Sequence, residues 1–228
     1  MIIAFAGQKG GIGKSTTAIS VAVAAHERGM RVLLVDADPQ GTARTWADVA
    51  SEGGHTTPTV IAMGATMHKA GQLATVAAGY DLVVIDCPPR HGDVQRSALM
   101  VADVAVLPCG PSAADAWALA TTLDVVKEAQ TLREDLKACI LITRKQRGTA
   151  IARSARRLME TSGMPVLFTE LGQRIAYQES IAMGRGPTSH APRDPAATEV
   201  NNLLDELRSF ANGEEANLGF TPQAAAAG

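Results

Sequence analysis

Short hydrophobic runs alternate with longer amphipathic stretches along most of the chain. Six runs have the length of buried strands, and they cover residues 1–6, 31–35, 59–63, 82–85, 104–107 and 138–142. Runs such as RVLLVD and YDLVVID do not alternate between apolar and polar residues. That pattern is typical of parallel strands that helices cover on both faces.

Helical patterns fill the gaps between these runs. They cover residues 15–28, 41–50, 68–77, 93–101, 115–132, 149–161 and 196–211. The alternation predicts an α/β fold, in which a doubly wound, mostly parallel sheet carries helices on both faces. We expect a single domain over residues 1–213. Residues 214–228 end in AAAAG and are expected to form a disordered tail.

Composition and charge limit the possible classes of protein. No run approaches 18 apolar residues and the N-terminus lacks a signal-peptide pattern, so we expect a cytoplasmic protein without a membrane span. The net charge is −2, which gives no overall attraction to nucleic acid. Residues 140–195, however, hold nine basic and four acidic side chains and form a candidate anion-binding surface.

The cysteines argue against metal or disulfide chemistry. Cys87, Cys109 and Cys139 are widely spaced, and none belongs to a C-x-x-C pair. Each lies in or beside an apolar run, where buried free thiols are common. We expect three structural cysteines in a reducing compartment.

The strongest chemical signal is the segment GQKGGIGKST, which begins at residue 7. It follows a predicted strand and opens a predicted helix, as a phosphate-binding loop requires. Its glycines let backbone N–H groups surround a phosphate, and the helix N-terminus adds positive potential. Lys14 is expected to reach the β- and γ-phosphates of ATP, and the Ser15 hydroxyl to ligate Mg²⁺. The predicted nucleotide-binding residues of this loop are Lys9, Gly10, Gly11, Ile12, Gly13, Lys14, Ser15 and Thr16.

The loop departs from the general P-loop pattern in two ways. Gln8 stands where the first glycine is expected, and Lys9 adds a second cation. The run KGGIGKST resembles the signature of the ParA/MinD family of ATPases. The resemblance implies a homodimer that sandwiches two ATP molecules face to face, in which Lys9 contacts the nucleotide of the partner subunit and stabilises charge there.

Acidic residues follow two of the predicted strands. Asp36 and Asp38 close the run VDADPQ, and Asp86 closes VVIDCPP. Ligand sites of doubly wound sheets lie at the carboxyl ends of the strands. We therefore expect Asp36, Asp38 and Asp86 to join Ser15 around Mg²⁺. The family resemblance implies that Asp38 orients the attacking water, and that residues 90–96 form a loop that senses the γ-phosphate.

Later segments extend the resemblance towards the short ParF-type members of the family. They are PCGPSAAD at residues 108–115, LITRK at 141–145 and RIAYQESI at 174–181. The resemblance thus spans residues 2 to about 207, and it implies that residues 108–115 lie along the dimer face. By position, we expect Arg144 and residues 192–195 to border the adenine and ribose.

A cluster of arginines on the predicted helix 149–161 suggests a further partner. Arg153, Arg156 and Arg157 are spaced three and four residues apart, which places them on one helix face. Such a face binds DNA phosphates without reading sequence, so we expect non-specific, salt-sensitive DNA binding. An ordinary solvated helix face explains the same charges.

The resemblance implies a slow, partner-stimulated, Mg²⁺-dependent ATPase of the ParA type. It would position a plasmid, a chromosome or a protein body on the nucleoid, with a ParB-like or cargo adaptor as partner. A MinD-like membrane-cycling ATPase is an alternative, but the last predicted helix is acidic rather than basic. A metal-cluster carrier would need exposed cysteine pairs. A small-molecule ATP-dependent enzyme of the same fold is the remaining alternative, and the second lysine argues against it.

Overall fold

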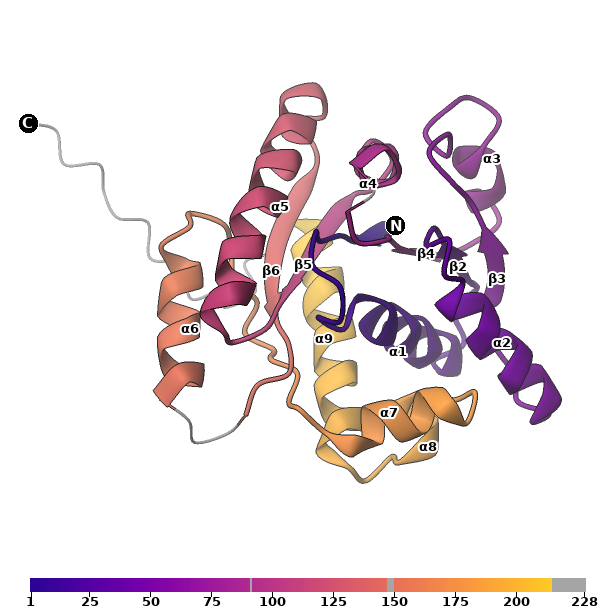
Figure 1. Cartoon of the computed structure of the whole chain (residues 1–228). Coiled ribbons are helices and arrows are strands. Elements are labelled where there is room, and N and C mark those ends of the chain that lie inside the picture. The colour runs from indigo at the N-terminus through magenta and orange to yellow at the C-terminus, as the bar shows by residue number, and fades with distance from the viewer. Residues whose placement is uncertain (91, 147–149, 215–228) are drawn as a thin grey trace, which may run out of the picture.

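The computed structural model describes residues 1–90, 92–146 and 150–214, without the side chains of residues 113 and 150–153. Its centre is a six-stranded sheet with the order β3-β2-β4-β1-β5-β6, and every pair of neighbouring strands is parallel (Figure 1). This confirms the predicted fold class. The strands are β1 (Ile2–Phe5), β2 (Val32–Asp36), β3 (Thr59–Ala62), β4 (Leu82–Asp86), β5 (Val104–Cys109) and β6 (Lys137–Ile142).

Helices cover both faces of the sheet (Figure 1). Alternate strand residues point to opposite faces, so Ile3 and Phe5 join one hydrophobic layer and Ala4 joins the other. The first layer holds α1 (Lys14–Glu27), α2 (Thr42–Glu52), α7 (Ile175–Ala182) and α9 (Pro195–Asn212), with α8 (Pro187–His190) against α1 and α9. The second holds α3 (Leu73–Ala77), α4 (Gly92–Leu99), α5 (Ala113–Leu132) and α6 (Ala150–Glu160). None of the described helices combines the length and apolar character needed to cross a membrane.

The structure differs from the sequence-based prediction at two places. The helix expected over residues 68–77 shrinks to α3, because Gly71 adopts a left-handed φ of 76° and the preceding residues form turns. The sequence analysis also missed α7 and α8. In α7, Ile175 is exposed while Ser180 is buried, so hydrophobic periodicity gave no signal. The predicted tail lies outside the described residues, apart from Glu214.

The last helix, α9, is part of the core. The Asp194 carboxylate caps it by accepting the amide of Ala196 at 2.7 Å, and Gly213 ends it with a φ of 71°. Its apolar side chains are fully buried in the layer that contains α1; they are Val200, Leu203, Leu204 and Leu207. Its polar face is tied to the domain as well, because Asp205 pairs with Arg28 of α1.

We expect Leu204→Ala to lower the free energy of unfolding by about 2–5 kcal/mol, because it removes a fully buried side chain and leaves a cavity. Urea unfolding followed by circular dichroism measures the change. Leu132→Ala is the matched control, since Leu132 is 71% exposed and its truncation is expected to change stability by less than about 1 kcal/mol. Equal effects of the two substitutions would contradict the placement of α9 in the core.

Candidate functional site

The turn between β1 and α1 builds one end of a cavity of about 470 Å³. Gly13 adopts a φ of 93°, a left-handed conformation that favours glycine, and α1 begins at the next residue. Predicted phosphate-binding residues that line the cavity are Gly10, Gly11, Gly13, Lys14, Ser15 and Thr16. The unpaired amides of a helix N-terminus and the glycine-rich turn thus meet at one hollow, which is the arrangement that binds phosphates.

Lys14 is buried in this turn. Only 6% of the residue is exposed, and its ammonium group donates to the carbonyl of Lys9 at 2.9 Å. Burial lowers the pKa of Lys14, and the nearby carboxylate of Asp86 opposes that shift. The cation is therefore held in place by the loop itself, at the edge of the cavity it lines.

Side chains from distant elements hold the backbone of the loop. Gln95 is fully buried and connects the two site loops, because its amide group donates to the carbonyls of Gly7 and Pro88, at 3.3 and 2.7 Å. Further bonds link Thr143 to the carbonyl of Ile12 at 2.8 Å, Arg144 to that of Gly11 at 2.8 Å, and the amide of Gln8 to Thr122 at 3.2 Å. The sequence analysis included Gln95 in the expected loop 90–96 and Thr143 in the segment 141–145, but it assigned neither of them a bond to the phosphate loop, and it did not single out Thr122. The side chain of Ile12 is buried, and Ile12 is not among the residues that line the cavity.

The carboxylates of Asp36 and Asp86 end neighbouring strands in matching register. Asp86 is fully buried, and neither of its carboxylate oxygens has a partner at hydrogen-bonding distance and angle among the residues that the structure describes. Burial raises the pKa of Asp86 to about 7; the Ser15 hydroxyl and the Lys14 charge oppose this shift, and the charge of Asp36 adds to it. An orphaned buried carboxylate is unfavourable unless a cation compensates it. Because carboxylate and hydroxyl oxygens are the ligands that Mg²⁺ prefers, Asp86 and Ser15 fit the predicted magnesium site.

Asp38 and Asp36 occupy different environments. Asp38 is half-exposed and lines the cavity. Asp36 lies behind it, where its carboxylate accepts the Asp38 amide at 3.2 Å and both the amide and guanidinium of Arg44, at 3.0 and 3.3 Å. Asp36 thus anchors the start of α2. Its role at the metal stays a prediction, as does the role of Asp38 in orienting water.

Lys9 points away from the cavity that the rest of the loop surrounds. Its ammonium group lies 2.6 Å from the carboxylate of Asp115, at the first turn of α5. Asp115 also caps that helix together with Ser112. Although burial disfavours the charged carboxylate, the hydrogen bonds from Lys9 and Ser112 lower the pKa of Asp115. Within the single chain, therefore, Lys9 does not line this cavity.

Residues 171–174, 177 and 178 form the remaining wall of the cavity, which we call the wall segment. Arg144 lines the cavity beside it, with a left-handed φ of 54° that is uncommon outside glycine. The expected position of residues 192–195 next to the adenine stays a prediction. None of them is among the lining residues of this cavity, and Asp194 caps α9.

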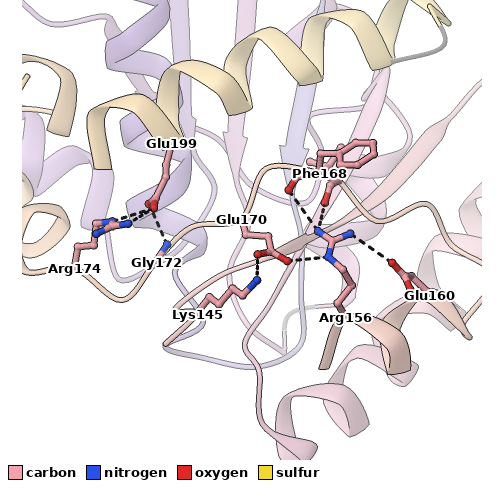
Figure 2. A network of polar contacts seen from close by, with 9 residues as sticks. Lys145, Arg156, Glu160, Phe168, Glu170, Gly172, Arg174 and Glu199 are labelled. Atoms are coloured by element: carbon pink, nitrogen blue, oxygen red, sulfur yellow. Dashed lines mark hydrogen bonds and ion pairs between the residues drawn. The ribbon is translucent and has the colours of Figure 1, made fainter. Parts of the chain in front are cut away.

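The arginines of α6 do not share one free face. Figure 2 shows Arg156 directed at Glu170, 2.8 Å away, with Glu160 at 3.6 Å on its other side. It also donates to the carbonyl of Leu167 at 2.7 Å, and its side chain is only 24% exposed. Arg157 is exposed, while the side chain of Arg153 lies outside the described residues. Arg156 is thus already neutralised within the chain.

All three cysteines are free and buried, as predicted. Burial raises the pKa of each thiol, that of Cys109 to about 12. Exposed thiolate pairs of the kind that a metal-cluster carrier needs are therefore not available.

Comparisons with known proteins agree with this architecture. A family model described as the CobQ/CobB/MinD/ParA nucleotide binding domain matches residues 3–187. The chain is 31% identical, over 90% of its length and 95% of the relative, to the maintenance of carboxysome distribution protein A of Halothiobacillus neapolitanus. It is 31% identical, over 90% and 94%, to the chromosome-partitioning ATPase Soj of Thermus thermophilus. The structure of cobyrinic acid a,c-diamide synthase from Mycobacterium smegmatis with bound ADP and magnesium superposes with a TM-score of 0.73 at 23% identity, over 97% and 99% of the two chains.

Proposed function

The chain belongs to the family of CobQ/CobB/MinD/ParA nucleotide-binding domains, and on that premise we propose that it is a Mg²⁺-dependent ATPase of the ParA type that positions or partitions a large cargo. The observation that carries the proposal is that two lysines of one loop point to different places. Lys14 lies at the nucleotide cavity, whereas Lys9 is directed out of it. A second cation that cannot serve its own cavity suits an ATPase that completes its site by dimerisation.

The chemistry follows from the residues around the cavity. Lys14 and the loop amides bind the β- and γ-phosphates, and Asp38 orients the attacking water. Ser15 and Asp86 would hold Mg²⁺, which would neutralise phosphate charge when it is bound. Lys9 of each subunit stabilises charge at the nucleotide of its partner in a homodimer that encloses two ATP molecules. Turnover is then slow until the dimer forms, which suits a timing device better than a metabolic enzyme.

The relatives support a cargo-positioning role over a metabolic one. Two relatives that share 31% of their residues with this chain are named for carboxysome distribution and for chromosome partitioning. We therefore propose that this chain moves a DNA molecule or a protein body along the nucleoid. A ParB-like or cargo adaptor would link the ATPase to that cargo and stimulate hydrolysis.

Non-specific DNA is the proposed track, and α6 is the proposed contact. Arg157 is exposed there, and Arg153 lies one turn before it. Because Arg156 is paired with Glu170 and Glu160, it is not expected to contribute as strongly as the sequence spacing suggested. The surface of α6 would then contact DNA phosphates without recognising the base sequence.

The experiment that tests this proposal measures binding to random double-stranded DNA across a salt series. We expect binding with ATP that falls steeply with salt and is lost with ADP and in Lys14→Ala. Arg157→Ala is expected to weaken binding about three- to tenfold and to reduce the salt slope. Arg208→Ala is the matched control, since Arg208 is an exposed arginine of α9 in the other helical layer. A chain that dimerises with ATP but does not bind DNA would contradict the nucleoid mechanism.

Two alternatives differ in how well the structure accommodates them. A MinD-like membrane cycle through the last described helix is disfavoured, because α9 buries its apolar side chains and ties Glu199 and Asp205 to other elements. A small-molecule ATP-dependent enzyme is the second candidate. The match to the synthase with bound ADP and magnesium shows that such enzymes share this fold. ATP binding without dimerisation or DNA binding would make the enzyme the better explanation.

A further inference from the structure

A single carboxylate outside the cavity holds two side chains and one amide of the wall segment. Glu199 of α9 accepts hydrogen bonds from the amide of Gly172 at 3.0 Å, from two nitrogens of Arg174 at 2.9 and 2.5 Å, and from the Tyr177 hydroxyl at 3.0 Å. Figure 2 shows Arg174 and the Gly172 amide converging on Glu199 from the loop that precedes α7. Glu199 itself is not a lining residue, and its side chain is 15% exposed.

The backbone of the wall segment is built to allow this convergence. A Cβ atom on Gly172 would approach the guanidinium of Arg174 to 3.1–3.3 Å, so glycine at this position leaves room for the arginine to fold back. On the other side, the backbone of Lys145 exchanges bonds of 3.0 Å with Leu171 and Gln173. The path of the backbone is therefore fixed by its neighbour after β6, whereas the orientation of Arg174 and Tyr177 is fixed by Glu199.

The groups that Glu199 holds have the chemistry of a nucleobase site. A guanidinium plane and a phenol ring both stack on planar bases. Tyr177 is only 7% exposed, but it is among the residues that line the cavity. Gln178 adds a side-chain amide to the same wall, and an amide can pair with both the donor and the acceptor on one edge of adenine. Gln173 lines the wall as well, but its side-chain oxygen already accepts a hydrogen bond from Gln146 at 2.9 Å. The charge of Arg174 is already balanced by Glu199, so this arginine does not compete with Lys14 for the phosphates.

We propose that Glu199 is a positioning residue for nucleobase recognition: it holds Arg174 and Tyr177 as the wall that receives the adenine of ATP. The inference rests on the nucleotide-binding part of the proposed function and is independent of DNA, adaptor and cargo. It predicts that Glu199 affects recognition of the base while leaving recognition of the phosphates unchanged.

The test compares Glu199→Gln with the parent chain in calorimetric titrations with ATP, GTP and inorganic tripolyphosphate, each with Mg²⁺. The substitution keeps the size of the side chain but removes the charge that orients Arg174. We expect ATP affinity to fall about tenfold or more, the preference for ATP over GTP to fall with it, and tripolyphosphate affinity to stay within about twofold.

Glu206→Gln is the matched control. Glu206 lies on the same helix and accepts the backbone amides of Phe168 and Thr169, at 2.6 and 2.9 Å, but it does not line the cavity. We expect its affinities for all three ligands to stay at the parent values. Tyr177→Phe removes only the hydroxyl donor to Glu199, and a loss of ATP affinity of about threefold is expected without a loss of folding.

Equal losses for ATP and tripolyphosphate in Glu199→Gln would overturn the inference, because a general disturbance of the fold acts on both ligands. Unchanged ATP affinity in Glu199→Gln, or in Tyr177→Phe if the former does not fold, would overturn it as well. If the parent chain binds neither ATP nor tripolyphosphate, the proposed ATPase function fails together with the inference. If the parent binds both ligands and the variants bind ATP as tightly as the parent does, the inference alone fails.

Discussion

Lys14→Ala is expected to weaken ATP binding by about a hundredfold and to abolish measurable ATP hydrolysis. Lys14 is 6% exposed as a residue and lines the cavity built by the glycine-rich turn. Truncating one partner of a buried, hydrogen-bonded charge pair weakens binding by about 3 kcal/mol, which corresponds to about a hundredfold in Kd. The same substitution is not expected to destabilise the free protein strongly, because burial already disfavours this cation, as its lowered pKa indicates.

Calorimetric titration with Mg²⁺ and ATP measures the affinity, phosphate release measures turnover, and urea unfolding without nucleotide measures stability. Lys127→Ala serves as the control, since Lys127 is an exposed lysine of α5 and its removal is expected to leave all three quantities unchanged. ATP affinity that survives in Lys14→Ala would contradict the assignment of this cavity as the phosphate site. A large loss of stability would instead show that the lysine supports the fold.

The sequence predicts the fold and the phosphate loop because their determinants are local. Each strand is a short apolar run, and the run GGIGKST is contiguous and lies between a strand and a helix. Parallel strands then bring Asp36 and Asp86 together at one edge of the sheet, which follows from topology alone. The prediction of α7 failed for the opposite reason, since its buried and exposed residues do not follow a helical hydrophobic period.

Contacts between residues far apart in the sequence could not be predicted from local sequence patterns. Nothing near Gln95 indicates that it links the carbonyls of Gly7 and Pro88. The spacing of the arginines in α6 predicted a shared basic face. Glu170, in the loop after that helix, pairs with Arg156, so the charge of this arginine is not available on that face. A carboxylate that pairs with a basic side chain through a tertiary contact reduces the positive charge of a surface. The spacing of the basic residues in the sequence, from which the surface was predicted, stays the same.

The ion pair between Lys9 and Asp115 has a consequence for dimerisation. In the single chain, Asp115 holds the ammonium group at the first turn of α5, in the segment that the resemblance places on the dimer face. Lys9 is still 36% exposed as a side chain, so the pair lies near the surface rather than deep in the core. Delivering Lys9 to a partner subunit therefore requires that Asp115 release it.

Lys9→Ala is expected to separate nucleotide binding from hydrolysis. Because Lys9 does not line the cavity, ATP affinity is expected to stay within about threefold of the parent value. Charge stabilisation supplied in trans accelerates phosphoryl transfer by about a thousandfold or more in related chemistry, so turnover is expected to fall at least a hundredfold, with loss of the ATP-dependent dimer. Light scattering after size exclusion measures the dimer, and phosphate release measures turnover.

Asp115→Asn is the paired substitution, because it releases Lys9 and leaves the Ser112 hydroxyl as a cap for α5. We expect the ATP dimer to form at lower protein concentration than in the parent, since the lysine no longer has to leave a carboxylate. The double variant Lys9→Ala with Asp115→Asn is expected to behave like Lys9→Ala, which shows that the effect of Asp115 passes through that lysine. If Lys9→Ala loses ATP binding as severely as Lys14→Ala does, the two lysines serve the same cavity. The assignment of Lys9 to the nucleotide of a partner subunit is then wrong.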